Sequence, residues 1–91
     1  MNFQFPIDLD WSTDEIVKVV ECLDLIEKAY HQSVEANAIL DKYRAFKTVV
    51  PSLGEEKRIG RAFEVDTGYS LYQTIKAARS QPNRKIKMTA H

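Results

Sequence analysis

The feature that most constrains this chain is a helix-capping pattern that occurs three times. A serine stands three residues before a glutamate or glutamine in Ser12–Glu15, Ser52–Glu55 and Ser70–Gln73. In such a capping box the serine hydroxyl accepts the amide of the third helical residue, and the acidic or amide side chain reaches back to the serine amide. Because each box precedes a segment with helical spacing of apolar residues, the sequence predicts three helix starts and gives each serine a structural role.

The apolar periodicity predicts four helices, over residues 13–30, 35–49, 53–67 and 71–80. The apolar positions of the first helix cover an arc of about 220°, wider than the stripe of an ordinary surface helix, so we expect this helix to be central. Pro51 ends the second helix because the residue before a proline is disfavoured in the α region. Gly68 can take the left-handed conformation that closes the third helix. These elements predict a small all-α protein, an orthogonal or irregular four-helix bundle.

The segment before the first capping box has a different period. Large apolar side chains alternate with polar residues or proline, at Phe3, Phe5, Ile7, Leu9 and Trp11. This is the period of a strand, yet the sequence offers no partner strand and Pro6 lacks an amide donor. We therefore expect residues 1–11 to form an extended arm that packs these side chains on the helices of its own chain, with Asp8 and Asp10 exposed.

The 91 residues leave room for one helical domain, over residues 1–81. Residues 82–91 have no periodicity and few apolar groups, which predicts a flexible basic tail. No apolar run is long enough to span a membrane, and the first residues lack the features of a signal peptide. Cys22 is the only cysteine. We therefore expect a cytoplasmic protein with no intrachain disulfide and no membrane contact.

The net charge of zero hides an uneven distribution of charge along the chain. Residues 1–50 hold nine acidic and five basic side chains, whereas residues 51–91 hold four acidic and eight basic ones. Such an asymmetry can indicate a polyanionic partner at the basic end. We favour the alternative in which the acidic half packs beside the basic half, or in which two copies associate as a homodimer.

Several motifs point to one family, and they are Phe5-Pro6-Ile7-Asp8-Leu9-Asp10-Trp11-Ser12-Thr13, Tyr43-Arg44-Ala45-Phe46-Lys47, Val50-Pro51-Ser52, Glu55-Glu56-Lys57, and Gly68-Tyr69-Ser70 with Tyr72 after it. In these stretches the chain resembles uncharacterised protein family 0223, a set of short bacterial proteins known mainly from Firmicutes. The resemblance implies a compact all-helical fold and a bacterial cytoplasmic protein. It implies no activity, because none is established for the family. The chain departs from the family pattern at Leu53-Gly54, where a lysine commonly follows the Pro-Ser pair.

The residues that carry chemistry in other proteins have simpler structural explanations here. The chain has no glycine-rich phosphate loop and no nucleophile elbow. Asp8 and Asp10, with Asp14 and Glu15 nearby, are the best cluster for a hard cation, but they lack the glycine and the bidentate glutamate of a calcium loop. Cys22 has none of the spacings of a zinc site, and we expect it to be buried. The sequence therefore predicts no enzyme activity, no metal and no cofactor.

Glu27 lies inside the apolar arc of the first helix, where a carboxylate is unusual. A buried carboxylate needs a partner. We therefore expect Glu27 to find a base or a hydrogen-bond donor on another helix, or to reach solvent. A catalytic role would also require a cleft and a second polar group.

The fourth helix carries the candidate interaction surface. It consists of Tyr72, Lys76 and Arg79 on one helix face, with Arg84, Lys85 and Lys87 added by the tail. Bases around an exposed aromatic ring can follow phosphates and stack on a nucleobase, which makes an accessory nucleic-acid-binding protein the alternative function. So few charges on a net-neutral protein would bind weakly and with strong salt dependence. We therefore favour a non-enzymatic protein that acts through contacts with an unknown protein partner.

Overall fold

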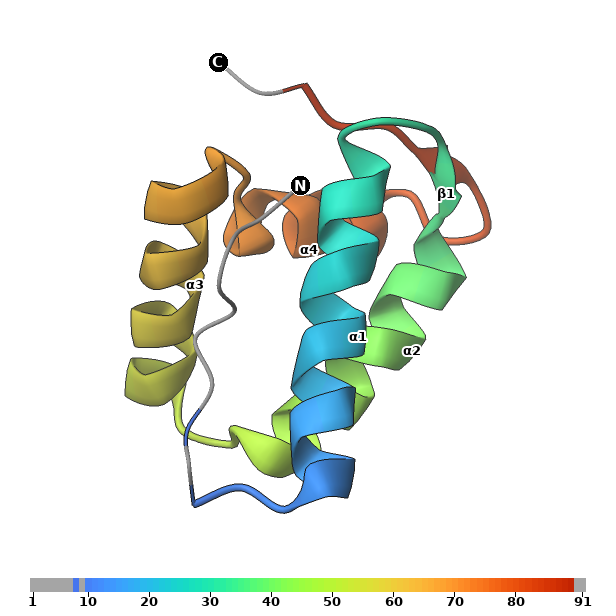
Figure 1. Cartoon of the computed structure of the whole chain (residues 1–91). Coiled ribbons are helices and arrows are strands. Elements are labelled where there is room, and N and C mark those ends of the chain that lie inside the picture. The colour runs from blue at the N-terminus through green and yellow to red at the C-terminus, as the bar shows by residue number, and fades with distance from the viewer. Residues whose placement is uncertain (1–7, 9, 90–91) are drawn as a thin grey trace.

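The structure is a computed structural model and describes residue 8 and residues 10–89. Its elements, in chain order, are α1 (Thr13–Ala29), β1 (Val34–Glu35), α2 (Ala36–Val49), α3 (Leu53–Thr67), α4 (Leu71–Ser80) and β2 (Lys85–Ile86). Figure 1 shows α1 and α2 side by side, α3 standing apart from them, and α4 running across behind α1. The predicted small all-α fold is confirmed, and the four helix bounds differ from the predicted ones by at most one residue.

All three predicted serine caps are present. Ser12 Oγ accepts the amide of Glu15 at 3.2 Å, and the Ser12 amide donates to Glu15 Oε1 at 2.8 Å, so this box closes in both directions. The other two serines accept the amides of Glu55 and Gln73, at 3.3 and 3.0 Å. These bonds satisfy amides that a helix leaves without a partner at its first turn.

The second and third boxes do not close in the reverse direction, because their partners are used elsewhere. Glu55 pairs with Arg58 one turn further along α3. The Ser70 amide donates to the Tyr30 hydroxyl at 3.0 Å, which ties the start of α4 to the end of α1. At the second box the glutamate therefore forms a surface ion pair, and at the third box the serine amide forms a long-range contact.

The core is built mainly on α1, as the wide apolar arc predicted. Five residues of α1 are buried, namely Val19, Cys22, Leu23, Ile26 and Ala29. The helix packs against α2 and α4. Phe46 of α2 and Phe63 of α3 have no exposed surface and are the two largest fully buried side chains. Burying one such side chain stabilises the fold by about 1.5–3 kcal/mol, so these two rings hold α2 and α3 to the core.

Only the end of the predicted arm lies within the described residues. Trp11 is half-buried and packs against the core. Asp10 is exposed as expected, but Asp8 is half-buried. Asp8 Oδ1 accepts the Asp10 amide at 2.9 Å and the Asp8 carbonyl accepts the Trp11 amide at 3.1 Å, so Asp8 closes a local turn. The expected burial of Phe3, Phe5, Ile7 and Leu9 lies outside the described residues.

The chain after α4 turns back toward α2, where the sequence predicted a tail without regular structure. Asn83 has a left-handed backbone with φ of 67°, a conformation that asparagine tolerates better than most residues. Its side chain accepts a hydrogen bond of 2.7 Å from the Asn37 amide group. The Pro82-Asn83 pair is thus a turn signal that the tail interpretation passed over.

The returning segment is fixed by backbone bonds and by one buried side chain. β2 pairs antiparallel with β1, with Val34 opposite Ile86. The amides of Ala36 and Met88 donate to the carbonyls of Arg84 and Ala29, each at 2.8 Å. Ile86 is only 4% exposed. These contacts correct the expectation of a flexible tail for residues 84–88.

Removing a cap hydroxyl should weaken the fold by a predictable amount. We expect Ser12→Ala, Ser52→Ala and Ser70→Ala each to lower the free energy of unfolding by about 1 kcal/mol, because each leaves a helix amide without its acceptor. Urea denaturation followed by circular dichroism measures this. Ser33→Ala, at an exposed position outside the helices, is the matched control. A Ser12→Ala variant as stable as the control would contradict the role of the caps.

The end of the chain should contribute to stability through Ile86. We expect Ile86→Ala to lower the free energy of unfolding by about 2–5 kcal/mol, because a fully packed side chain is truncated. Lys87→Ala changes an exposed neighbour and should stay within about 0.5 kcal/mol of the parent. Equal stability of the two variants would show that the β1–β2 contact does not hold in solution.

Candidate interaction surface

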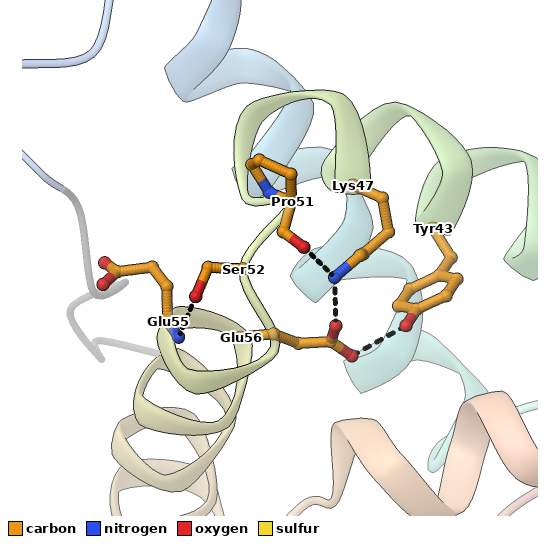
Figure 2. A network of polar contacts seen from close by, with 6 residues as sticks. All are labelled: Tyr43, Lys47, Pro51, Ser52, Glu55 and Glu56. Atoms are coloured by element: carbon orange, nitrogen blue, oxygen red, sulfur yellow. Dashed lines mark hydrogen bonds and ion pairs between the residues drawn. The ribbon is translucent and has the colours of Figure 1, made fainter.

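A carboxylate on α3 connects this helix to α2. Glu56 lies in the first turn of α3, and its side chain is only 14% exposed. Its Oε1 accepts Lys47 Nζ at 2.6 Å, and its Oε2 accepts the Tyr43 hydroxyl at 2.7 Å. Lys47 also donates to the Pro51 carbonyl at 3.3 Å. Figure 2 shows these contacts meeting at the α2–α3 corner, so both oxygens of Glu56 have partners within the protein.

The Tyr43 phenol stays protonated in this arrangement. Burial, together with the hydrogen bond to Glu56 and the charge of Glu56, raises the pKa of Tyr43 to about 12. A protonated phenol can only donate to the carboxylate it faces, so the contact persists across the physiological pH range.

Arg79 of α4 extends this cluster to a third helix. Its guanidinium carbon lies 5.3 Å from the centre of the Tyr43 ring. A cation over an aromatic face is attracted by the electron-rich ring, by about 0.5–1 kcal/mol at an exposed site. The ring therefore gives the exposed Arg79 side chain a preferred position.

An apolar groove runs between α3 and α4. We use the name apolar groove for the space of about 490 Å³ lined by Leu53, Glu56, Lys57, Gly60, Arg61, Glu64, Ser70, Leu71 and Tyr72. The α3 residues of this set recur every three or four positions, so they form one helix face. Leu53 is 61% exposed and Tyr72 is 69% exposed. The groove thus presents two large apolar side chains to solvent.

A smaller pocket adjoins this groove on the α2 side. We call it the cationic pocket; it encloses about 250 Å³ and is lined by Tyr43, Glu56, Tyr72, Ile75, Lys76, Arg79 and Ser80. Glu56 and Tyr72 line both spaces, so they form the wall between the groove and the pocket. Ile75 is 4% exposed and buried beneath the polar residues around it.

The ion pairs leave the bases around these two spaces without acidic partners. The described residues form four ion pairs, Glu21–Lys42, Asp41–Arg44, Lys47–Glu56 and Glu55–Arg58. Only Lys47–Glu56 joins the two halves of the chain, and its base comes from the acidic half. The acidic half packs beside the basic half as expected, since α1 and α2 contact α4, but ion pairs contribute little to that packing in the described residues. Among the described bases that line the groove or the pocket, none takes part in an ion pair, and these bases are Lys57, Arg61, Lys76 and Arg79.

The six residues predicted as an interaction surface fall into two groups. Tyr72, Lys76 and Arg79 lie together around the cationic pocket. Arg84 and Lys85 border a different hollow with Glu35, Asn37 and Asn83, and Lys87 follows β2 as an exposed residue. A role of either group in binding stays a prediction.

Sequence reasoning missed the α3 side of the groove, which consists of Leu53, Lys57, Gly60 and Arg61. A signal was present, because Leu53 stands directly after a capping serine and outside the apolar stripe of its helix. Gly60 lies opposite Leu71, whose Cδ2 would be 3.6 Å from a Cβ at that position. Because glycine has no side chain, Gly60 adds no side-chain atoms to the bottom of the groove where α3 and α4 face each other.

Two other candidates from the sequence have structural roles. Cys22 is 1% exposed, as predicted, and burial, with the charge of Glu56, raises the pKa of its thiol to about 12. A protonated buried thiol is a poor nucleophile. Asp8 closes a local turn with Asp10. Over residues 8 and 10–89, the structure holds no group of three metal-ligating side chains.

Glu27 remains the unusual carboxylate that the sequence indicated. The residue is half-buried, so part of it reaches solvent. Its Oε2, however, is covered and has no hydrogen-bond partner among the described residues. The expected partner on another helix is therefore not found for this oxygen.

None of the described helices is long and apolar enough to cross a membrane.

Comparison with known proteins gives a family but no activity. The model of the uncharacterised protein family UPF0223 matches residues 2–87. A UPF0223 protein of Staphylococcus saprophyticus is 46% identical over 86 residues, which cover 94% of both chains. A UPF0223 protein of Streptococcus sanguinis is 47% identical over 87 residues, which cover 96% of this chain and 95% of the relative. A UPF0223 protein of Streptococcus pneumoniae is 46% identical over the same length.

The Tyr43–Glu56 contact predicts a late step in the titration of the tyrosines. Since folding raises the pKa of Tyr43 from 10.0 to about 12, the unfolded chain loses this proton first as the pH rises. The stability that Tyr43 contributes is thus complete below pH 10 and is lost between pH 10 and about 12.

Ultraviolet absorbance of the phenolate should therefore show a step near pH 12 in the folded parent. Tyr43→Phe should remove this step, whereas Tyr72→Phe, at an exposed tyrosine of the same surface, should keep it. Circular dichroism at each pH verifies that the protein is folded. A late step that survives in Tyr43→Phe would contradict the assignment.

Proposed function

We propose that this chain, which belongs to the uncharacterised protein family UPF0223, is a non-enzymatic bacterial cytoplasmic protein that docks a segment of another protein. The observation that carries the proposal is the apolar groove between α3 and α4, with Leu53 and Tyr72 exposed at its edge. Large apolar side chains gathered at one site on a protein surface favour contact with a partner.

The shape of the groove favours a helical segment as the occupant. Its α3 wall is a helix face with residues at intervals of three and four. An amphipathic helix binds such a groove through apolar anchors at the same intervals. Tyr72 is a suitable contact, because tyrosine combines a large apolar ring with a polar end and loses little side-chain freedom on binding.

The charges around the groove favour an acidic segment. Lys57 and Arg61 on α3 face the groove without acidic partners in the described part of the chain. Lys76 and Arg79 add two bases at the adjoining pocket. Glu56 is paired with Lys47, which leaves Glu64 as the acid of the groove without an ion pair in the described residues. Acidic residues beside the apolar anchors of the partner would complement this surface.

The residues with catalytic potential support a non-enzymatic role. The three capping serines are engaged by backbone amides. Cys22 is buried as a protonated thiol. Each of these residues thus contributes to the fold through a contact that catalysis would have to break.

Photo-crosslinking in the cell tests the proposal. Benzoylphenylalanine replaces Tyr72 at the groove, and in a second variant it replaces Val65, which is 78% exposed on α3 but does not line the groove. Both proteins are expressed in a bacterium related to the hosts of the known relatives. We expect a protein adduct at position 72 that is absent at position 65 and is lost when Arg61→Glu is added.

The crosslinked peptide itself decides the outcome. Mass spectrometry should identify a segment with apolar residues at helical spacing and an excess of aspartate and glutamate. Adducts to nucleic acid would favour the alternative of an accessory nucleic-acid-binding protein and overturn the proposal. Equal adducts at the two positions, or a basic crosslinked segment, would also overturn it.

A further inference from the structure

We infer that the cationic pocket binds one carboxylate side chain of the docked segment, with Arg79 as its principal ligand. The inference rests on the proposed function, because it names one anchor by which the partner is held. The observation behind it is a guanidinium fixed in place beside an enclosed space, with no acid in the described residues paired to it.

Arg79 is prepared for an anion by the ring beneath it. Its guanidinium carbon lies 5.3 Å from the centre of the Tyr43 ring. A guanidinium carries five N–H donors in a planar fork, more than Tyr43 can engage, and this fork matches the two oxygens of a carboxylate. Because the ring restricts the side chain before binding, less conformational freedom is lost when the anion arrives.

Glu56 does not occupy Arg79, although it lines the same pocket. Lys47 holds one oxygen of Glu56 at 2.6 Å and the Tyr43 hydroxyl holds the other at 2.7 Å. The protonated phenol thus serves two purposes, since it directs Glu56 toward α2 while its ring supports Arg79. Lys76, three residues before Arg79 on the same helix, supplies a second positive charge to the pocket.

The size and lining of the pocket favour a single acidic side chain. A space of about 250 Å³ accommodates a side chain but not a folded element. Ile75 and the ring of Tyr72 provide apolar surface for the methylene groups of a glutamate. Partial exclusion of water by these groups strengthens an ion pair beyond what it gains in bulk solvent.

Glu56 also discriminates between anions. Its carboxylate borders the pocket, so each added negative charge on a ligand meets more repulsion. A carboxylate with one charge is therefore favoured over a phosphate with nearly two. The same argument disfavours a nucleic-acid backbone, in which several phosphates would have to pass this position.

Nuclear magnetic resonance with small probes tests the pocket without the partner. The labelled full chain is titrated with N-acetylglutamate amide, with N-acetylglutamine amide and with inorganic phosphate. We expect saturable shifts of the Arg79 side-chain N–H and the Ser80 amide with the glutamate probe, at a Kd of about 1–10 mM for a single charged contact. The glutamine probe should give none, and phosphate should bind more weakly than glutamate.

Arg79→Gln should raise the Kd of the glutamate probe at least about tenfold, equivalent to about 1.4 kcal/mol. Arg61→Gln is the matched control, because it removes the same charge from the apolar groove outside the pocket; it should change the Kd by less than about twofold, since salt screens distant charges. Equal effects of the two variants, no saturable shift at Arg79, or stronger binding of phosphate would overturn the inference.

The two proposals fail in different experiments. If the glutamate probe shifts no signal, the carboxylate anchor is contradicted. The crosslinking result at position 72 does not depend on that titration. If the crosslinked segment proves basic or nucleic acid is captured, the docking function fails, and the glutamate titration then reports an anion site with no protein partner. A crosslinked acidic segment whose affinity falls with Arg79→Gln would support both.

Discussion

One nearly buried carboxylate fixes the start of α3 against α2, beside the apolar packing that holds α3 to the core. Glu56 is 14% exposed, and a charge with so little water around it is costly unless other groups replace the water. Tyr43 and Lys47 do this from successive turns of α2, so the start of α3 is fixed against the end of α2. Removing one partner would leave a charge uncompensated, which costs more than the pair contributes when it is intact. The corner thereby sets the direction in which α3 leaves the core, and with it the groove between α3 and α4.

Local rules predicted the elements, whereas contacts between distant residues determined the surface. The capping serines and Gly68 act over three or four residues, and each is found where the sequence placed it. Ile86 could not be assigned in this way, because its burial depends on Val34, far earlier in the chain. An isolated turn signal at Pro82-Asn83 specifies a reversal of direction but not its destination. The same holds for Tyr72, whose predicted exposure was right, while its neighbours on α3 follow only from the packing of two helices.

The uneven distribution of charge along the sequence does not show which charged residues pair in the fold. Three of the four ion pairs among the described residues join partners from the same half of the chain. The bases of α3 and α4 that line the groove and the pocket are not used in these pairs. Exposed ion pairs stabilise a protein by about 0–1 kcal/mol at most, so leaving these bases unpaired costs the fold little. On the proposed function, their main effect would be an electrostatic field that accelerates the approach of an acidic partner.

The adjacency of an apolar groove and a cationic pocket has a consequence for orientation. Apolar contact is non-directional, so a groove lined by Leu53 and Leu71 alone would accept a helix in either direction and in several registers. A charge-assisted bond to Arg79 is directional, and it lies at one side of the groove, beyond the shared wall of Tyr72 and Glu56. One acidic residue at a fixed distance from the apolar anchors therefore selects a single register. In the proposed complex the apolar part would supply most of the affinity and the pocket would supply the specificity, so that one helical segment is distinguished from another.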